Sequence, residues 1–406
     1  MEFLTAVTPG EALGIIKSFP LPKRKRLRVR IDEALGRVLA EEVVASDDIP
    51  PFARSLVDGF AVRVKDIYGA RETTPALLVA KGEVRVGQQT TLKVGPGEAI
   101  YVATGAMLPE EADGVVMQEQ TRQTAHDLEV TKTVHKGENI CFQGEDIKRG
   151  TRVLVPGKRI SAFDTGVLAA LGIDEVTVYA LPEIALISSG DEIVPIDVIP
   201  PLGKVRDINR YTVSNLLVSA GCSVHFIGIA ADRLDDISAK LQEARDFDVI
   251  ILSGGSSKGE SDFVTAALET LGGKLLFHGI NVRPGKPTIF GRLWDKPVFG
   301  LPGHPVSCSL IVLRFVLPML TALKGETDPR QQTVRGRLGA NVPSSYGIEE
   351  YVRVKLAFVE GDWVVAPLYA KSSVISMLAK ADGYIIVPEG SEGLEAGEEV
   401  EVYTFG

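Results

Sequence analysis

The sequence is poor in cysteine and carries no excess of basic residues. Its 406 residues include three cysteines, Cys141, Cys222 and Cys308. Their odd number and wide spacing exclude a disulfide framework and a Cys-x-x-Cys metal site. Lysine and arginine number 44 against 53 aspartate and glutamate residues, for a net charge of −9. This balance argues against a nucleic-acid partner, which would need a broad basic surface.

The sequence also has little that predicts a membrane or export segment. The first residues, MEFLTAVTPGEAL, do not place a basic region before a long apolar run. The most apolar stretch, 310–320, is interrupted by Arg314 and Pro318 and is too short to span a bilayer. None of the five histidines has metal-ligand spacing to another. We therefore expect a cytoplasmic protein with no membrane partner.

The length and the spacing of turn residues predict several domains. At ~150 residues per domain, the length corresponds to two or three domains, or more if some are small. Glycine-rich turns separate short apolar runs in one region, which predicts a β domain. A later region alternates strands and helices, which predicts a doubly wound, mostly parallel sheet. We expect a helical linker unit over 1–49 and 143–180, an inserted β domain over 50–142, an α/β domain over 181–328 and a C-terminal β domain over 329–406.

Local patterns predict individual elements within these units. In the segment 9–45, apolar residues recur near the 3.6-residue period after acidic starts at Glu11 and Asp32, which predicts two helices. In the inserted β domain, one of the expected strands covers 91–94. In the α/β domain, a long helix is expected over 306–320.

Two motifs follow strands of the expected α/β domain, at the sheet edge where doubly wound folds bind ligands. The first, Ser188-Ser-Gly-Asp-Glu, is either an acidic turn or a place where Asp191 and Glu192 hold Mg²⁺ through water. The second is Ser253-Gly-Gly-Ser-Ser-Lys-Gly-Glu-Ser-Asp. Its small residues and lysine at a helix start predict a phosphate cradle, although a flexible turn has the same composition. It matches neither the Walker A motif nor the dinucleotide fingerprint.

Two further motifs in this domain suit an anion. Val282-Arg-Pro-Gly-Lys-Pro places Arg283 and Lys286 three residues apart in a turn stiffened by proline. This arrangement suits an oxyanion, or it is a Pro-Gly turn with incidental charges. Leu301-Pro-Gly-His-Pro-Val-Ser opens the long helix, whose free backbone N–H groups favour an anion. His304 is equally a turn residue or a ligand.

The order of the motifs along the chain is more specific than any one of them. Taken singly, Asp58, Thr104 and Asp146 each lie close to a glycine and are turn caps or candidate site residues. The motifs run in the order Val57-Asp-Gly-Phe-Ala, Ala103-Thr-Gly-Ala, Met117-Gln-Glu-Gln, Gly144-Glu-Asp-Ile, Ser189-Gly-Asp-Glu, Ser253-Gly-Gly, Pro284-Gly-Lys-Pro and Leu301-Pro-Gly-x-Pro-Val-Ser. Over essentially its whole length the sequence resembles the molybdopterin molybdenumtransferase family, which comprises bacterial MoeA and the E domain of gephyrin.

The resemblance implies an enzyme that inserts molybdate or tungstate into the dithiolene of adenylylated molybdopterin. The pyrophosphate linkage is hydrolysed, AMP leaves, and the molybdenum cofactor results, with Mg²⁺ assisting. The resemblance also implies an elongated homodimer, with a cleft between the α/β domain of one subunit and the inserted β domain of the other. Expected further partners are a molybdopterin adenylyltransferase and the molybdoenzymes that accept the product.

The resemblance also assigns roles to residues. The family's catalytic positions match Asp58, Thr104, Glu192 and Asp262. Positions that would hold Mg²⁺ match Glu192, Asp262, Asp146 and Asp232. Positions that bind substrate or oxyanion match residues of the cradle, the cationic turn, the long helix and the C-terminal domain: Gly254, Gly255, Ser256, Ser257, Lys258, Gly259, Arg283, Lys286, Pro287, Ser307, Arg353 and Ser372.

Four residues depart from the family pattern. Arg54 and Lys258 add positive charge, Arg283 replaces a lysine, and His304 replaces a common asparagine. Arginine is a forked donor and lysine a point charge, so a different oxyanion geometry is expected. Two alternatives stay open: a carrier that binds pterin or oxyanion without turnover, and an adenylyltransferase acting on molybdopterin, which the four-unit layout disfavours.

Overall fold

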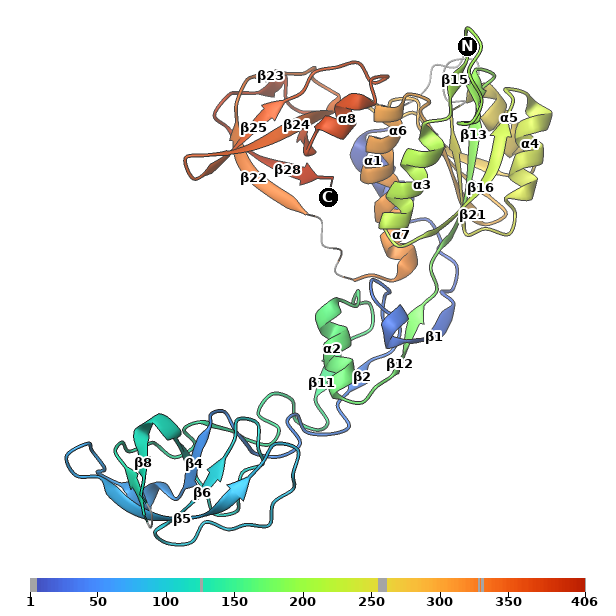
Figure 1. The fold of residues 1–406 in the computed structure, drawn as a ribbon. Coiled ribbons are helices and arrows are strands. Elements are labelled where there is room, and N and C mark those ends of the chain that lie inside the picture. Colours follow the sequence, from blue (N-terminus) through green and yellow to red (C-terminus); the bar gives the residue numbers. More distant parts are fainter. Residues whose placement is uncertain (1–5, 125–126, 255–260, 328, 330–331, 406) are drawn as a thin grey trace.

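The computed structural model describes residues 6–124, 127–254, 261–327, 329 and 332–405, without the side chains of Ser261 and Asp262. The molecule is elongated (Figure 1). The inserted β domain lies at one end, the linker unit in the middle, and the α/β and C-terminal domains side by side at the other end. The multidomain fold class expected from the sequence is confirmed.

The α/β domain is built on a six-stranded sheet with helices on both faces. Its helices are α3 (Asn209–Ser219), α4 (Leu234–Glu243) and α5 (Ser261–Thr270). Side chains of α3 share one buried core with α1 (Pro9–Lys17), whereas α4 and α5 pack on the opposite face. The first four strands are parallel and the last two antiparallel, in the order β16 (Ser223–Ala230), β13 (Glu183–Ser189), β17 (Val249–Ser253), β21 (Lys296–Leu301), β20 (Ile289–Leu293) and β18 (Lys274–His278).

The long helix of this domain is longer than the apolar stretch in the sequence suggested. It runs without a break through α6 (Pro305–Ile311), a π-helical segment (Val312–Val316) and α7 (Leu317–Lys324). The helix is 20 residues long and its most apolar 18-residue window has a mean hydropathy of 2.0, so the expectation that the segment is too short to cross a membrane was wrong by length and composition. However, 67% of the apolar window is buried inside the protein, as in a core helix.

The linker unit contains fewer helices than expected, partly because α1 packs in the core of the α/β domain. Its β1 (Arg26–Arg30) pairs antiparallel with β12 (Glu175–Tyr179), and α2 (Ala162–Ala170) begins with a capping box at Ser161. The helix predicted from Asp32 is wrong, because the chain there forms only a 3₁₀ turn, Ile31–Glu33. Gly36 adopts φ +74 and the following residues are extended against the rest of the unit, which ends the helical path.

The inserted β domain is a mixed sheet with a buried core on each face. Its strands lie in the order β7 (Gly114–Met117), β4 (Gly59–Val62), β6 (Glu98–Val102), β5 (Ala76–Val84), β9 (Leu128–Val130) and β8 (Thr121–Gln123). The strand predicted over 91–94 is reduced to a single bridge between Lys93 and Glu110.

The C-terminal domain is a closed barrel that borrows a strand from the α/β domain. Its strands are β22 (Thr333–Leu338), β24 (Glu349–Val359), β25 (Asp362–Pro367), β26 (Gly383–Val387) and β28 (Glu399–Thr404), and the pairing of β24 with β26 closes the ring. The short β19 (Val282–Arg283) comes from the α/β part of the chain and pairs in parallel with β24. This pairing joins the two domains through their backbones.

A partly buried ion pair reinforces that junction. Arg314 of the π-helical segment lies 3.6 Å from a carboxylate oxygen of Glu349, which also accepts a 2.6 Å hydrogen bond from the Tyr351 hydroxyl. Burial acts to lower the pKa of Arg314, but Glu349, Tyr351 and Tyr384 together outweigh it, so the pKa is raised. The pair therefore fixes β24 against the long helix.

We predict that Glu349→Gln loosens the C-terminal domain. The substitution leaves the partly buried Arg314 without a counter-charge, so we expect a loss of about 2–4 kcal/mol in the stability of this domain. Differential scanning calorimetry measures the effect as a lower unfolding temperature of this domain. The matched control is Glu399→Gln, which breaks the exposed pair with Arg335 and should cost about 0–1 kcal/mol. Equal shifts in both variants would contradict the role of the ion pair.

Candidate functional site

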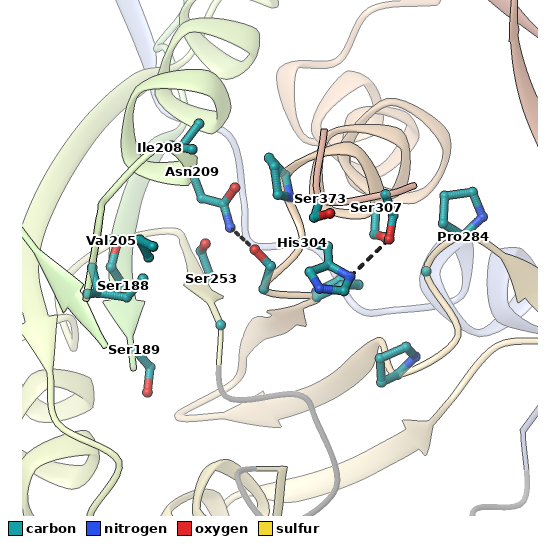
Figure 2. Close-up of a pocket in the computed structure, with 18 of the residues that line it drawn as sticks. Ser188, Ser189, Val205, Ile208, Asn209, Ser253, Pro284, His304, Ser307 and Ser373 are labelled. Atoms are coloured by element: carbon teal, nitrogen blue, oxygen red, sulfur yellow. Dashed lines mark hydrogen bonds between the residues drawn. The ribbon is translucent and has the colours of Figure 1, made fainter. Parts of the chain in front are cut away.

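A cavity of about 790 Å³ lies between the α/β domain and the C-terminal domain. It opens at the carboxyl ends of the parallel strands, where doubly wound folds bind ligands. Figure 2 shows side chains from several strand ends and from α3 arranged around it. Its lining includes Ser188, Ser189, Glu192, Asp207, Asn209, Ser253, Gly254, Arg283, Lys286, Pro287, His304, Ser307, Ser372 and Ser373.

One wall is formed by buried serines at the ends of β13 and β17. The Ser188 hydroxyl donates a 2.6 Å hydrogen bond to Asp207, whose other oxygen accepts the backbone N–H of Arg210 at 3.0 Å. Ser189 and Ser253 are buried beside it. The sequence analysis missed Asp207, although the polar pair Asp207-Ile-Asn209 at a helix start was a signal for it.

Asn209 presents an acceptor to the same cavity. The residue is 8% exposed, and its amide nitrogen donates a 2.9 Å hydrogen bond to the Gly303 carbonyl, which fixes the orientation of the group (Figure 2). The amide oxygen is buried and has no hydrogen-bond partner among the described residues. Because an unpaired buried acceptor is costly, it suits a ligand that brings an N–H or O–H donor.

Gly254 allows the backbone at the end of β17 to approach β13 closely. It adopts φ +97, and a Cβ built there would lie 2.0 Å from the Ser189 carbonyl oxygen. Only glycine fits such a position. The side chain of Asp262 lies outside the described residues. So do the remaining predicted cradle residues, which are Gly255, Ser256, Ser257, Lys258 and Gly259. The phosphate cradle therefore stays a prediction.

The cationic turn, Arg283-Pro-Gly-Lys-Pro, lines the opposite wall of the cavity. Arg283, Lys286 and Pro287 all border the cavity. Arg283 forms an ion pair with Glu350 at 3.4 Å, whereas Lys286 has no ion-pair partner within the described part of the chain. The two cations predicted to bind an oxyanion are thus brought together, but in different electrostatic settings.

The C-terminal domain completes the cavity through one loop. Ser372 forms a 2.9 Å hydrogen bond with Nδ1 of His304, and its carbonyl accepts the backbone N–H of Val306 at 3.2 Å. Ser307 lies buried one residue further along α6. His304 therefore links the long helix to the C-terminal loop. Its position in the sequence motif left this role open.

Arg353 lies behind this loop and is absent from the cavity lining. It is 8% exposed and donates a 2.7 Å hydrogen bond to the Ala370 carbonyl, two residues before Ser372. Burial lowers the pKa of Arg353. Its other buried nitrogens, Nε and Nη1, have no hydrogen-bond partner in the described chain, so this guanidinium retains donors for a ligand or a loop movement.

Of the predicted metal carboxylates, Glu192 and Asp232 lie at the loop after β13, and Asp146 lies in a different part of the fold. Glu192 is exposed and borders the cavity. Asp232 instead accepts hydrogen bonds from the Ser189 hydroxyl at 2.8 Å and the Asp191 N–H at 3.2 Å, which braces the loop after β13. The described residues contain no group of three or more His, Cys, Asp or Glu side chains that could hold a metal ion.

The remaining predicted residues lie far from the cavity. Asp58 and Thr104 meet in the inserted β domain, where the Thr104 N–H donates a 2.8 Å hydrogen bond to Asp58. Asp146 is exposed near the junction with the linker unit, and its N–H binds the Ile49 carbonyl. In Figure 1 the inserted β domain and the α/β domain occupy opposite ends of the molecule. A single chain therefore does not bring Asp58 or Thr104 to the cavity.

Comparison with known proteins links this architecture to one family. Three family profiles match the chain: the MoeA N-terminal region, domains I and II, over 7–172; a probable molybdopterin binding domain over 185–322; and the MoeA C-terminal region, domain IV, over 335–405.

Individual relatives and structures agree with these profiles. A putative molybdopterin biosynthesis protein of Methanocaldococcus jannaschii is 36% identical over 94% of this chain and 93% of its own. The molybdopterin molybdenumtransferase of Bacillus subtilis is 33% identical over 92% of this chain and 88% of its own. The crystal structure of a molybdopterin biosynthesis MoeA protein from Pyrococcus horikoshii superposes with a TM-score of 0.82 at 36% identity, covering 99% of this chain and all of the other.

We predict that thiol reagents distinguish the three cysteines. Burial raises the pKa of Cys222 to about 11 and that of Cys308 to about 12. Because only the thiolate reacts, on the order of 0.1% or less of either thiol is reactive at pH 8. Cys141 is partly exposed. Titration of the native protein with a thiol reagent at pH 8 should label Cys141 rapidly and the other two only after denaturation. Equal rates at all three would contradict the burial of Cys222 and Cys308.

Proposed function

Because the chain belongs to the MoeA family, we propose that it is a molybdopterin molybdenumtransferase. A transferase role in molybdenum cofactor biosynthesis follows from the curated relatives that carry this name. The finer proposal is that it inserts molybdate or tungstate into adenylylated molybdopterin. Water cleaves the pyrophosphate bond and AMP leaves. The two dithiolene thiols bind the metal of the oxyanion, and their protons leave with one of its oxygens as water.

The observation that carries the proposal is the composition of the cavity. Arg283 and Lys286 border it from one side, and two fixed cations suit a tetrahedral dianion. Buried serines and Gly254 line the other side at the strand ends, which suits the phosphates of the substrate. The described cysteines sit outside the cavity lining, which is consistent with reactive thiolates that come from the substrate.

Mg²⁺ is part of the proposal, and Glu192 is the carboxylate that fits it best. Glu192 borders the cavity, and carboxylate oxygens are preferred ligands of this ion. When bound, Mg²⁺ would neutralise charge on the phosphate oxygens. Asp262, Asp232 and Asp146 stay candidate ligands.

A homodimer is proposed for a geometric reason. Asp58 and Thr104 lie in the inserted β domain, remote from the cavity of their own chain. A second copy would supply them to the cavity. We also propose the four-unit division of the chain given above, a cytoplasmic location, an adenylyltransferase as the source of the substrate and molybdoenzymes as acceptors of the product.

The test of this function is AMP release from adenylylated molybdopterin with Mg²⁺, in the presence of molybdate, tungstate or no oxyanion. We expect release to be stimulated by an oxyanion, and the better oxyanion identifies the metal. Stoichiometric binding without AMP release would contradict the transferase and favour the carrier. Pyrophosphate release from ATP and molybdopterin would favour the adenylyltransferase.

We predict that Glu192→Gln lowers oxyanion-stimulated AMP release by roughly 10²-fold or more, because a neutral amide is a poor Mg²⁺ ligand. The fold should stay intact, since Glu192 is exposed, and circular dichroism verifies this. The control variant is Glu269→Gln, which changes an exposed carboxylate on α5 and should keep full activity. Unchanged activity of the Glu192 variant would remove that residue from the mechanism.

A further inference from the structure

The two cations of the Arg283-Pro-Gly-Lys286 turn are not equivalent. Both border the cavity. Nη1 of Arg283 lies 3.4 Å from Oε2 of Glu350, and Nη2 lies 3.4 Å from the Ser345 hydroxyl. Lys286 has no such partner among the described residues. One of the two charges available to an anion is therefore already shared with a carboxylate of the C-terminal domain.

The backbone builds this contact into the domain junction. In the parallel pairing of β19 with β24, Arg283 and Glu350 are register partners. The Glu350 side chain is 19% exposed, against 48% for Arg283. Oε2 of Glu350 also accepts a 2.8 Å hydrogen bond from Ser344. Glu350 is thus the more buried member of the pair and Arg283 the more exposed one.

The neighbouring residue keeps Glu350 in place. Successive side chains of a strand point to opposite faces, and Glu349 pairs with Arg314 of the long helix. The Glu349 N–H also donates a 3.0 Å hydrogen bond to the Asn281 carbonyl, next to β19. Glu350 therefore cannot follow Arg283 when this guanidinium turns toward a ligand in the cavity.

We propose that Glu350 is a positioning residue that sets the oxyanion affinity of the cavity by competing for Arg283. The proposal rests on the function proposed above. An anion that enters the cavity has to draw the Arg283 guanidinium away from the Glu350 carboxylate. Arginine suits this exchange, because its planar fork can contact a carboxylate on one edge and an oxyanion on the other.

The consequence is a cavity that small anions from solution fill weakly. Each dianion meets Lys286, which has no ion-pair partner among the described residues, but only the shared charge of Arg283. If Glu350 loses its charge, molybdate and sulfate should both bind more tightly, because both depend on the same guanidinium. The gain should vanish when Arg283 is also replaced by a neutral residue.

The experiment is a double-mutant cycle read by isothermal titration calorimetry. Sodium molybdate and sodium sulfate are titrated into the full-length wild type, Glu350→Gln, Arg283→Gln and the double variant, in dilute buffer. We expect Glu350→Gln to tighten both dissociation constants about tenfold, and less than about twofold in the Arg283→Gln background. Glutamine can still accept the Ser344 hydrogen bond, and thermal melting of each variant checks its fold.

The matched control is Glu360→Gln, which removes the same charge just after the far end of β24, ten residues from Glu350. It should leave both dissociation constants unchanged, because screening is effective over that distance. An unchanged affinity in Glu350→Gln, or an equal gain in the Arg283→Gln background, would overturn the inference. So would an absence of binding in both wild type and Glu350→Gln. AMP release that does not depend on the oxyanion would refute the proposed function but not the role of Glu350, because the mutant cycle measures only anion affinity.

Discussion

The parallel pairing of β19 with β24 is the contact on which the cavity depends. It places two residues from the α/β part of the chain, Val282 and Arg283, in the sheet of the C-terminal barrel. The cationic turn begins at Arg283. Its position relative to the wall formed by Ser188, Ser189 and Ser253 is therefore fixed by backbone hydrogen bonds between the two domains. The Arg314–Glu349 pair and the His304–Ser372 hydrogen bond hold the same junction from two other sides. A cavity with walls from two domains therefore keeps a defined shape.

Much of the fold follows from local periodicity. The alternation of buried strands such as β13 and β17 with amphipathic helices such as α4 predicts the doubly wound sheet, because each strand must be covered on both faces. The same reasoning failed at Asp32, where the apolar spacing is helical but Gly36 turns the chain. It also failed at 91–94, where an apolar pattern gained only one bridge. In both places tertiary contacts outweighed the local preference.

Only those site residues that are charged or are glycines in a recognisable motif could be predicted from the sequence. Gly254, Arg283 and Lys286 stand out in the sequence and border the cavity. Asp207 and Asn209 gave only the weak signal of two polar residues at a helix start, because their importance comes from burial and from partners more than 15 residues away in the chain. The pairing of Arg283 with Glu350 is equally invisible in sequence, since 67 residues separate the two. Which cation is paired with a carboxylate is therefore a property of the folded domain junction.

The π-helical segment in the long helix changes the direction in which the side chains on either side of it point. A π turn holds one residue more than an α turn, and one residue corresponds to a rotation of about 100° around the axis. The faces of α6 and α7 are therefore out of step with each other. Upstream of the offset, Ser307 faces the cavity. Downstream of it, α7 packs against α1. A single-residue deletion in this segment would realign the two halves and misdirect one of them, so the helix tolerates substitution there better than a change of length.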